Sequence, residues 1–102
     1  MDYKSDIAKY TSNIDEKAIT ATVRYCGIAL QTRDASLVSC TDTAETDRIR
    51  NGFALKVLGL GEAEAAQAIN AICEKMKADN NKQRVTFYYL LAEAARKLDK
   101  LA

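Results

Sequence analysis

The segment from Asn13 to Leu30 has apolar residues at helical spacing around most of its circumference. One row consists of Ile14, Ala18, Ala21, Tyr25 and Ile28, and a second row beside it of Ile19, Val23, Cys26 and Leu30. Only the strip of Lys17, Thr20 and Arg24 is predicted to face water. Because a helix that is apolar on most sides is surrounded by other elements, the segment predicts a helical bundle with this helix at its centre.

Similar spacing and end signals predict four more helices, at about 2–11, 43–58, 62–77 and 82–99. We expect the second and the last of the five helices to form the core. The chain has no proline, and no stretch shows the apolar/polar alternation of a half-buried strand. Its 102 residues are enough for one domain with its own core. The sequence therefore predicts an all-α fold, a compact bundle of about five helices forming a single domain over residues 1–102.

The ends of the predicted helices carry recognisable capping signals. Asn13 with Glu16, and Asp42 with Glu45, have the spacing of capping boxes. Gly59 is suited to the left-handed position that follows a helix, with the next residue making the accompanying apolar contact. The carboxylates of the first helical turns are thereby assigned to helix ends and not to acid/base chemistry.

The three cysteines, Cys26, Cys40 and Cys73, are far apart in the sequence. Their odd number and the lack of a close pair fit neither a disulfide framework nor a zinc motif, so we expect three reduced and mostly buried thiols. The chain has no histidine, which excludes Ser/His and Cys/His nucleophiles and argues against zinc sites. We expect a protein that is not an enzyme and has no cofactor, catalytic residue or metal ligand.

The segment 31–46 is long, irregular and rich in hydroxyl and carboxylate side chains. One interpretation is a series of turns in which these side chains bind their own backbone. The other is a site for a small ligand or an anion, formed by Asp34, Ser36, Ser39, Thr41 and Asp42. Side chains bonded only to their local backbone would count against the second interpretation.

The stretch "RVTFYYLLAE" places three aromatic residues side by side. On a helical wheel Phe87 falls on the core face, and Tyr88 falls at its border with its hydroxyl near solvent or a polar partner. Tyr89 points the opposite way, together with Val85 and Arg96. Either Tyr89 packs against the N-terminal helix, or Val85, Tyr89 and Arg96 form a contact for a partner or a second copy. Complete burial of Tyr89 within its own chain would contradict the second interpretation.

The net charge of +1 is unevenly distributed. Residues 1–47 carry five basic and eight acidic side chains, whereas residues 48–102 carry ten basic and six acidic ones. The basic half supports nucleic-acid binding as an alternative function, although no standard nucleic-acid-binding motif is present. Its candidate residues are Arg48, Arg50, Lys56, Lys75, Lys77, Lys82, Arg84, Arg96, Lys97 and Lys100.

No apolar run approaches the ~20 residues that a membrane span requires. The N-terminal stretch "MDYKSDIAKY" lacks the basic start and apolar middle of a secretory signal. We therefore expect a cytoplasmic protein with no membrane partner.

The stretches "DASLVSC", "LGL" and "RVTFYYLLAE" resemble a family of small bacterial proteins classed as a domain of unknown function. The resemblance extends over almost the whole chain. It implies a compact helical bacterial domain and supplies no activity, cofactor or catalytic residue. We expect a non-enzymatic protein-interaction or self-associating domain, whose partner is another protein or a second copy in a homodimer, with nucleic-acid binding as the alternative.

Overall fold

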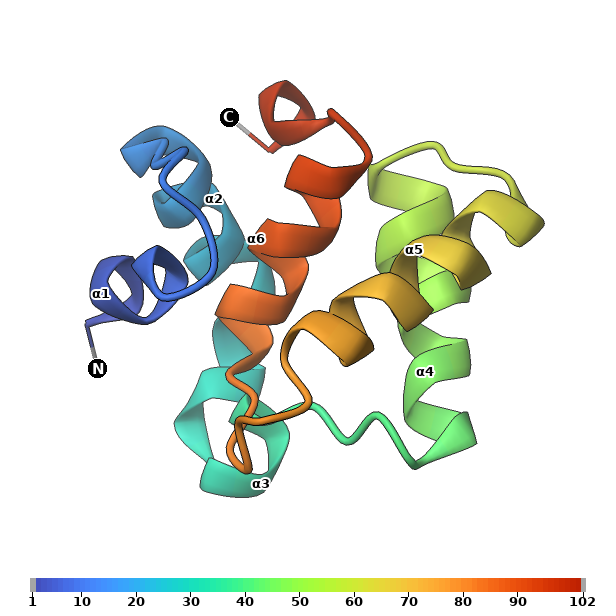
Figure 1. Cartoon of the computed structure of the whole chain (residues 1–102), viewed down its shortest axis with the longest axis horizontal. Coiled ribbons are helices and arrows are strands. Elements are labelled where there is room, and N and C mark those ends of the chain that lie inside the picture. The colour runs from blue at the N-terminus through green and yellow to red at the C-terminus, as the bar shows by residue number, and fades with distance from the viewer. Residues whose placement is uncertain (1, 102) are drawn as a thin grey trace.

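The computed structural model describes residues 2–101, which fold into helices joined by turns and loops (Figure 1). The α-helices are α1 (Tyr3–Ala8), α2 (Glu16–Cys26), α3 (Arg33–Ser36), α4 (Thr43–Ile49), α5 (Glu62–Lys75) and α6 (Arg84–Ala94). Two short 3-10 helices, η1 (Gly27–Gln31) and η3 (Leu98–Lys100), follow α2 and α6, and a π-helix, η2 (Arg50–Val57), continues α4. Residues 2–101 contain no strand, so the predicted all-α fold is confirmed. None of these helices has the length and apolar character needed to cross a bilayer.

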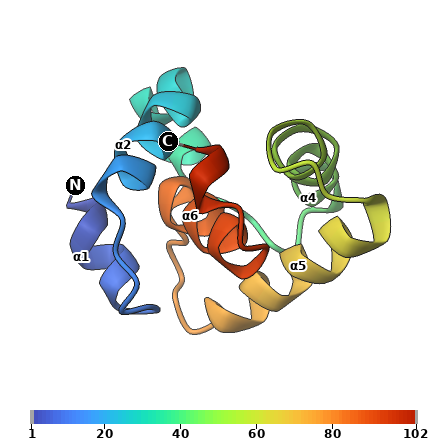
Figure 2. The same ribbon diagram turned by 90° about the horizontal axis from the view of Figure 1, so that it is seen from above.

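Helix α6 is the centre of the molecule. Every residue from Val85 to Ala92 is buried. Helices α1 and α2 lie on one side of α6, and α5 and α4 lie on the other (Figure 2). Because both sides are covered, no face of this helix needs to be polar. The last predicted helix therefore belongs to the core as expected, and it is more central than the helix at 13–30.

Helix α2 is packed on one side only, so its predicted place at the centre of the bundle is wrong. It buries Ala18, Thr22 and Cys26, but Tyr25 is 49% exposed and Ile28 is 82% exposed. The physical reason is that the helix ends at Gly27, where φ is 40°. A turn at this residue directs Ile28 out of the row that the wheel assigns to it. The polar strip of Lys17, Thr20 and Arg24 faces solvent, as predicted.

An aromatic cluster links the two sides of the bundle. Phe53 of η2 stacks on Tyr88 of α6 with ring centroids 4.4 Å apart. The ring of Tyr25 lies 5.2 Å from Phe53 and 6.1 Å from Tyr88. Phe53 is fully buried, whereas Tyr25 covers the cluster with one face and leaves the other in solvent.

The helix ends follow some of the predicted capping signals and not others. Asp15, and not Asn13, caps α2, because its carboxylate accepts from the backbone N–H of Lys17 at 3.0 Å. Asp42 caps α4 as predicted, accepting from the N–H of Ala44. Gly59 has φ 71° and is followed by a buried leucine, which confirms the predicted left-handed residue.

The predicted helix at 82–99 ends early, at Ala94, in a Schellman motif. The N–H of Lys97 donates to the carbonyl of Ala92 at 2.8 Å, and that of Arg96 to the carbonyl of Glu93 at 3.0 Å. Arg96 has φ 59°, in the left-handed region that glycine prefers. An arginine at this position keeps its Cβ in an unfavourable place.

We expect Arg96→Gly to raise the free energy of unfolding by about 1 kcal/mol, because it removes the strain of a left-handed residue. Urea denaturation at pH 7 measures the change. Arg96→Ala is the matched control, since it removes the same charge and keeps Cβ. Equal stabilisation by both variants would show that charge, and not backbone conformation, is responsible.

Candidate functional site

The predicted partner contact of Val85, Tyr89 and Arg96 is contradicted by the structure. Val85 and Tyr89 are completely buried within the chain. The Tyr89 hydroxyl donates to the carbonyl of Asn13 at 2.6 Å and accepts from the N–H of Asp15 at 2.8 Å. Tyr89 thus fastens the segment between α1 and α2 to α6, next to the N-terminal helix against which the alternative interpretation placed it. The wheel failed here because it assumes one buried face, and α6 has two.

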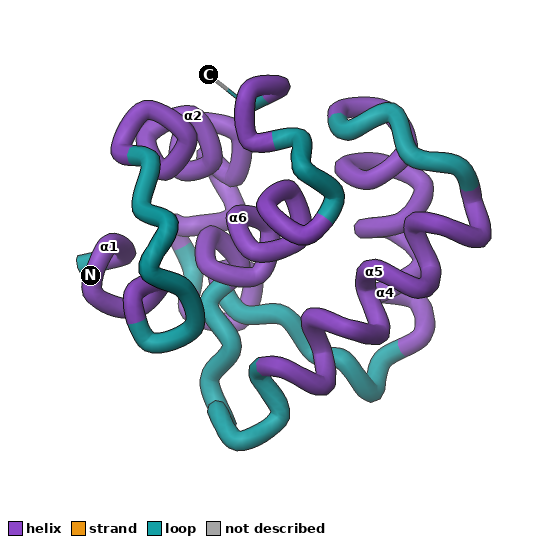
Figure 3. The backbone as a smooth tube through the Cα atoms, turned by 45° about the horizontal axis from the view of Figure 1, so that its top comes forward, coloured by secondary structure: helices purple, strands orange, loops and turns teal. Residues whose placement is uncertain are grey.

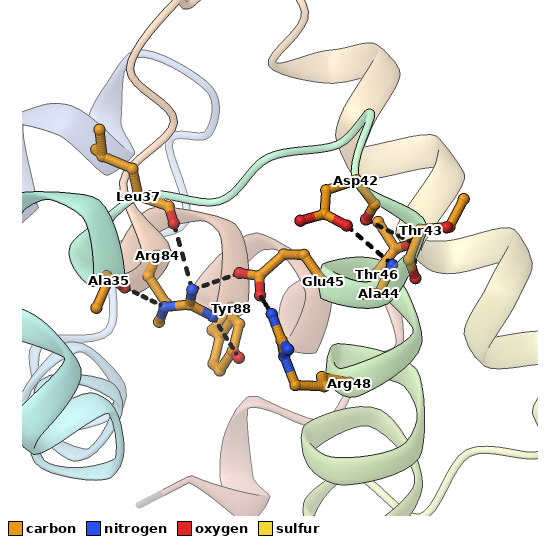
Figure 4. A network of polar contacts seen from close by, with 10 residues as sticks. All are labelled: Ala35, Leu37, Asp42, Thr43, Ala44, Glu45, Thr46, Arg48, Arg84 and Tyr88. Atoms are coloured by element: carbon orange, nitrogen blue, oxygen red, sulfur yellow. Dashed lines mark hydrogen bonds and ion pairs between the residues drawn. The ribbon is translucent and has the colours of Figure 1, made fainter.

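Arg84, a largely buried arginine at the start of α6, binds polar groups of several neighbouring elements (Figure 4). Arg84 donates from Nε to the carbonyl of Ala35 at 2.7 Å, and from Nη2 to that of Leu37 at 3.3 Å. Its Nη1 donates to the Tyr88 hydroxyl at 3.0 Å, and Nη2 also pairs with Glu45. The side chains of Arg84 and Glu45 are only 13% and 9% exposed. Each guanidinium nitrogen is occupied, so the arginine serves as a structural tie between α6, α4 and the α3 region.

The cleft beside this arginine, of about 520 Å³, is also lined by Asp34, Ser39 and Asp42 of the polar loop. The remaining carboxylate in the cleft, Glu45, is held by Arg84 and by Arg48 at 2.9 Å. The cleft therefore presents no unpaired buried ionisable group to a ligand.

Four of the five predicted ligand residues of the polar loop make local side-chain contacts. The Ser36 hydroxyl donates to the carbonyl of Arg33 at 2.8 Å, and Asp42 caps α4. Ser39 and Thr41 are bonded to each other at 3.4 Å, and Asp34 is exposed. The contacts of Ser36 and Asp42 are those of self-capping turns and count against a ligand role for these two residues. Within residues 2–101, Asp34, Ser39 and Thr41 have no side-chain bond to the local backbone and line a shared cleft of about 410 Å³, so their part of the ligand site stays a prediction.

The structure corrects the prediction of three reduced thiols, because Cys40 and Cys73 form a disulfide. Their Cα atoms are 5.9 Å apart although 33 positions separate them in the sequence. The loop between α3 and α4 (Figure 3) is held at one end by the N–H of Val38, which donates to the carbonyl of Lys82 at 2.8 Å. The disulfide fastens the middle of this loop, at Cys40, to α5. Since disulfides are rare in the cytoplasm, this bond lends no support to the cytoplasmic location, which stays a prediction.

Cys26 is the remaining thiol; it is buried, and burial raises its pKa to about 11. Its thiolate is the reactive form, so we expect almost no alkylation of the native protein by iodoacetamide at pH 8 and complete alkylation in 8 M urea. Mass spectrometry measures the labelling. Rapid labelling of the native protein would contradict the burial of this thiol.

The raised pKa of Cys26 also affects the pH dependence of stability. Because the folded-state pKa exceeds the ordinary value of 9.0, the thiol contributes stability below pH 9 that is lost as the pH rises to about 11.

A second polar cleft, of about 530 Å³, lies beside α1. Its carboxylates are already bound: Asp6 pairs with Lys9 at 3.1 Å and accepts from Thr86, and Asp79 accepts from the Tyr10 hydroxyl at 3.0 Å. As in the cleft beside Arg84, the carboxylates of this cleft already have hydrogen-bond or ionic partners within the chain.

A third hollow differs from these two, and we call it the α2 groove. It consists of two adjoining cavities of about 400 and 280 Å³ that share Ala21, Arg24 and Leu101. The apolar lining is Ala21, Tyr25, Val57 and Leu101, and the charged lining is Glu16, Lys17, Arg24 and Lys100. Sequence reasoning found only the exposed strip of α2, because the opposite wall comes from residues far along the chain.

The cationic side chains that line the α2 groove are not paired with acidic side chains of residues 2–101. The carboxylate that lines one end of the groove is paired with a lysine outside it. Glu16 is 3.2 Å from Lys4, whereas Lys17, Arg24 and Lys100 form no ion pair within that range. The candidates for nucleic-acid binding are different in this respect. Four of them already pair with acidic side chains of the chain itself, namely Arg48, Arg50, Lys77 and Arg84.

Comparison with known proteins gives one family. A family model described as "Protein of unknown function (DUF2853)" matches residues 2–99. No curated protein matches the chain. The match covers α1 to α6 together with the α2 groove up to residue 99.

Proposed function

We propose that this chain, which belongs to the DUF2853 family of unknown function, is a non-enzymatic domain that binds another protein. The observation that carries the proposal is the pair of exposed apolar side chains at the end of α2. Tyr25 is 49% exposed and Ile28 is 82% exposed, while the other large apolar side chains of residues 2–101 are buried or half-buried.

The location of Tyr25 beside the α2 groove makes this exposed pair a candidate binding surface. Single exposed apolar residues are common on soluble proteins, but Tyr25 also lines the α2 groove together with Val57 and Leu101. Burying a side chain such as isoleucine in an interface yields about 1.5–3 kcal/mol. Tyrosine is enriched among the residues that dominate binding energy. The end of α2 therefore has the composition of a small binding surface.

The absence of an enzymatic role is supported by how the buried ionisable groups are used. Asp6, Glu45 and Arg84 are each bound to side chains of the same molecule. Two of the clefts therefore lack a free buried acid or base. The sequence also contains no histidine.

Site-specific photo-crosslinking in the native host tests the proposal. A photoreactive phenylalanine analogue at position 28 is compared with the same analogue at position 63, an exposed site on α5. We expect defined protein adducts from position 28 that are absent from position 63. Adducts to the chain itself would support the self-associating form of the proposal.

Two results would contradict protein binding at this surface. One is a pattern of adducts from position 28 identical to that from position 63. The other is crosslinking of position 28 to nucleic acid in place of protein, which would favour the alternative function. The variant with the analogue at position 28 should keep the unfolding midpoint of the unsubstituted chain, because the side chain at this position is exposed, so its adducts report binding and not misfolding.

A further inference from the structure

We infer that the α2 groove binds an acidic amphipathic helix of a partner protein. The inference rests on the proposed function, because Tyr25 belongs both to the exposed apolar surface and to the groove. It adds the secondary structure and the charge of the partner segment.

The length of the groove suits a short helical segment. Its lining runs along α2 from Glu16 to Tyr25. At 1.5 Å per residue this is about 14 Å, or two and a half turns of a helix lying beside α2. The opposite wall is formed by Val57 of η2 and by Lys100 and Leu101 near the end of η3.

A helical peptide suits the α2 groove better than an extended or a proline-rich peptide. Extended peptides add to the edge of a sheet, and residues 2–101 contain no sheet to extend. Proline-rich peptides use grooves lined by several aromatic rings, whereas this groove has Tyr25 alone. A groove between helical elements, lined by the apolar side chains of Ala21, Tyr25, Val57 and Leu101, instead matches the binding of an amphipathic helix by its apolar face.

The charge of the groove selects an acidic partner. Lys17, Arg24 and Lys100 line the groove together with its apolar side chains and have no partner acid in residues 2–101. The single lining carboxylate, Glu16, is neutralised by Lys4. The whole chain has a net charge of only +1, so the three cations are a local excess. Complementary charge accelerates association and disfavours partners of the wrong sign.

A pair of designed peptides tests the inference. Both are 14-residue amphipathic helices with the same leucine face, and their polar faces carry glutamate in one and lysine in the other. Fluorescence anisotropy in 50 mM NaCl measures binding to the full chain. We expect the acidic peptide to bind at least tenfold more tightly, and 500 mM NaCl to weaken its binding several-fold through screening.

Charge reversals in the groove provide the matched controls. Arg24→Glu should weaken binding of the acidic peptide, whereas Lys75→Glu, a reversal at another exposed residue on α5, should leave it unchanged. The triple variant Lys17→Glu, Arg24→Glu, Lys100→Glu should reverse the preference toward the lysine peptide. All four substituted residues are exposed, so circular dichroism should show unaltered helicity.

Several outcomes would overturn the inference. They are equal binding of the two peptides, no binding of either, or an acidic preference that Arg24→Glu leaves intact. Tighter binding of a single-stranded oligonucleotide or of anionic lipid vesicles by the same cations would also overturn it, as would a dimer that Arg24→Glu dissociates. Protein adducts from position 28 combined with failure of both peptides would leave the proposed function in place and remove only the acidic helix.

Discussion

Replacement of Arg84 by methionine is expected to lower the free energy of unfolding by about 3–5 kcal/mol, the usual cost of removing one partner of a buried ion pair. The substitution leaves the Glu45 carboxylate, which is 9% exposed, with Arg48 as its remaining ionic partner. It also removes the donor to the carbonyls of Ala35 and Leu37. Methionine preserves much of the side-chain volume, so the loss measures polar contacts more than a cavity.

Urea denaturation at pH 7 measures this effect, and Arg48→Met is the matched control. Arg48 contacts the same carboxylate, but its side chain is 71% exposed, so its loss should cost no more than about 1 kcal/mol. If both variants lose the same free energy of unfolding, the burial of Arg84 makes no additional contribution to stability. The double variant Arg84→Met, Glu45→Leu should lose less than Arg84→Met alone, because no largely buried carboxylate is left without its buried partner.

Loss of the disulfide should have an effect of similar size. The bond between Cys40 and Cys73 closes a loop with 33 positions of sequence separation, for which loop-closure entropy gives about 3–4 kcal/mol. Cys40→Ser, Cys73→Ser should therefore unfold at a clearly lower urea concentration than the oxidised protein. Addition of dithiothreitol should lower the midpoint of the unsubstituted chain to a similar extent.

The serine variant is also the control for the reductant. Dithiothreitol should have no effect on its midpoint, because its remaining cysteine is already a free thiol. An unchanged midpoint of the unsubstituted chain after complete reduction would contradict the stabilising role of the bond. Mass spectrometry after alkylation establishes that reduction was complete.

Local patterns predicted the fold class and most helix positions. The carboxylate at Asp42, the glycine at Gly59 and the spacing of apolar residues in 62–77 act within a few residues of the features they specify. The signal at Glu45 was misleading, since its spacing from Asp42 suits a capping box but its carboxylate pairs with Arg84, 39 residues away. A local pattern cannot show that a distant partner competes for the same side chain.

The same distinction explains the errors around the candidate site. The exposed strip of Lys17 and Arg24 is a property of one helix, and the sequence predicted it. The α2 groove depends on Val57 and Leu101, which only the tertiary structure brings to that helix. The disulfide likewise joins a loop to α5. The sequence left Tyr89 between packing within the chain and a partner contact, because a helical wheel contains no information on how many neighbours surround the helix.

The central position of α6 has a consequence for biosynthesis. It is the last α-helix of residues 2–101, and helices that precede it pack on its two sides. At translation rates of about 5–20 residues per second, the 83 residues before it take about 4–17 s to be made. During that time α5 can pack on η2, but the apolar faces that contact α6 have no native partner. We therefore expect these faces to stay exposed until α6 emerges and the core can close around it.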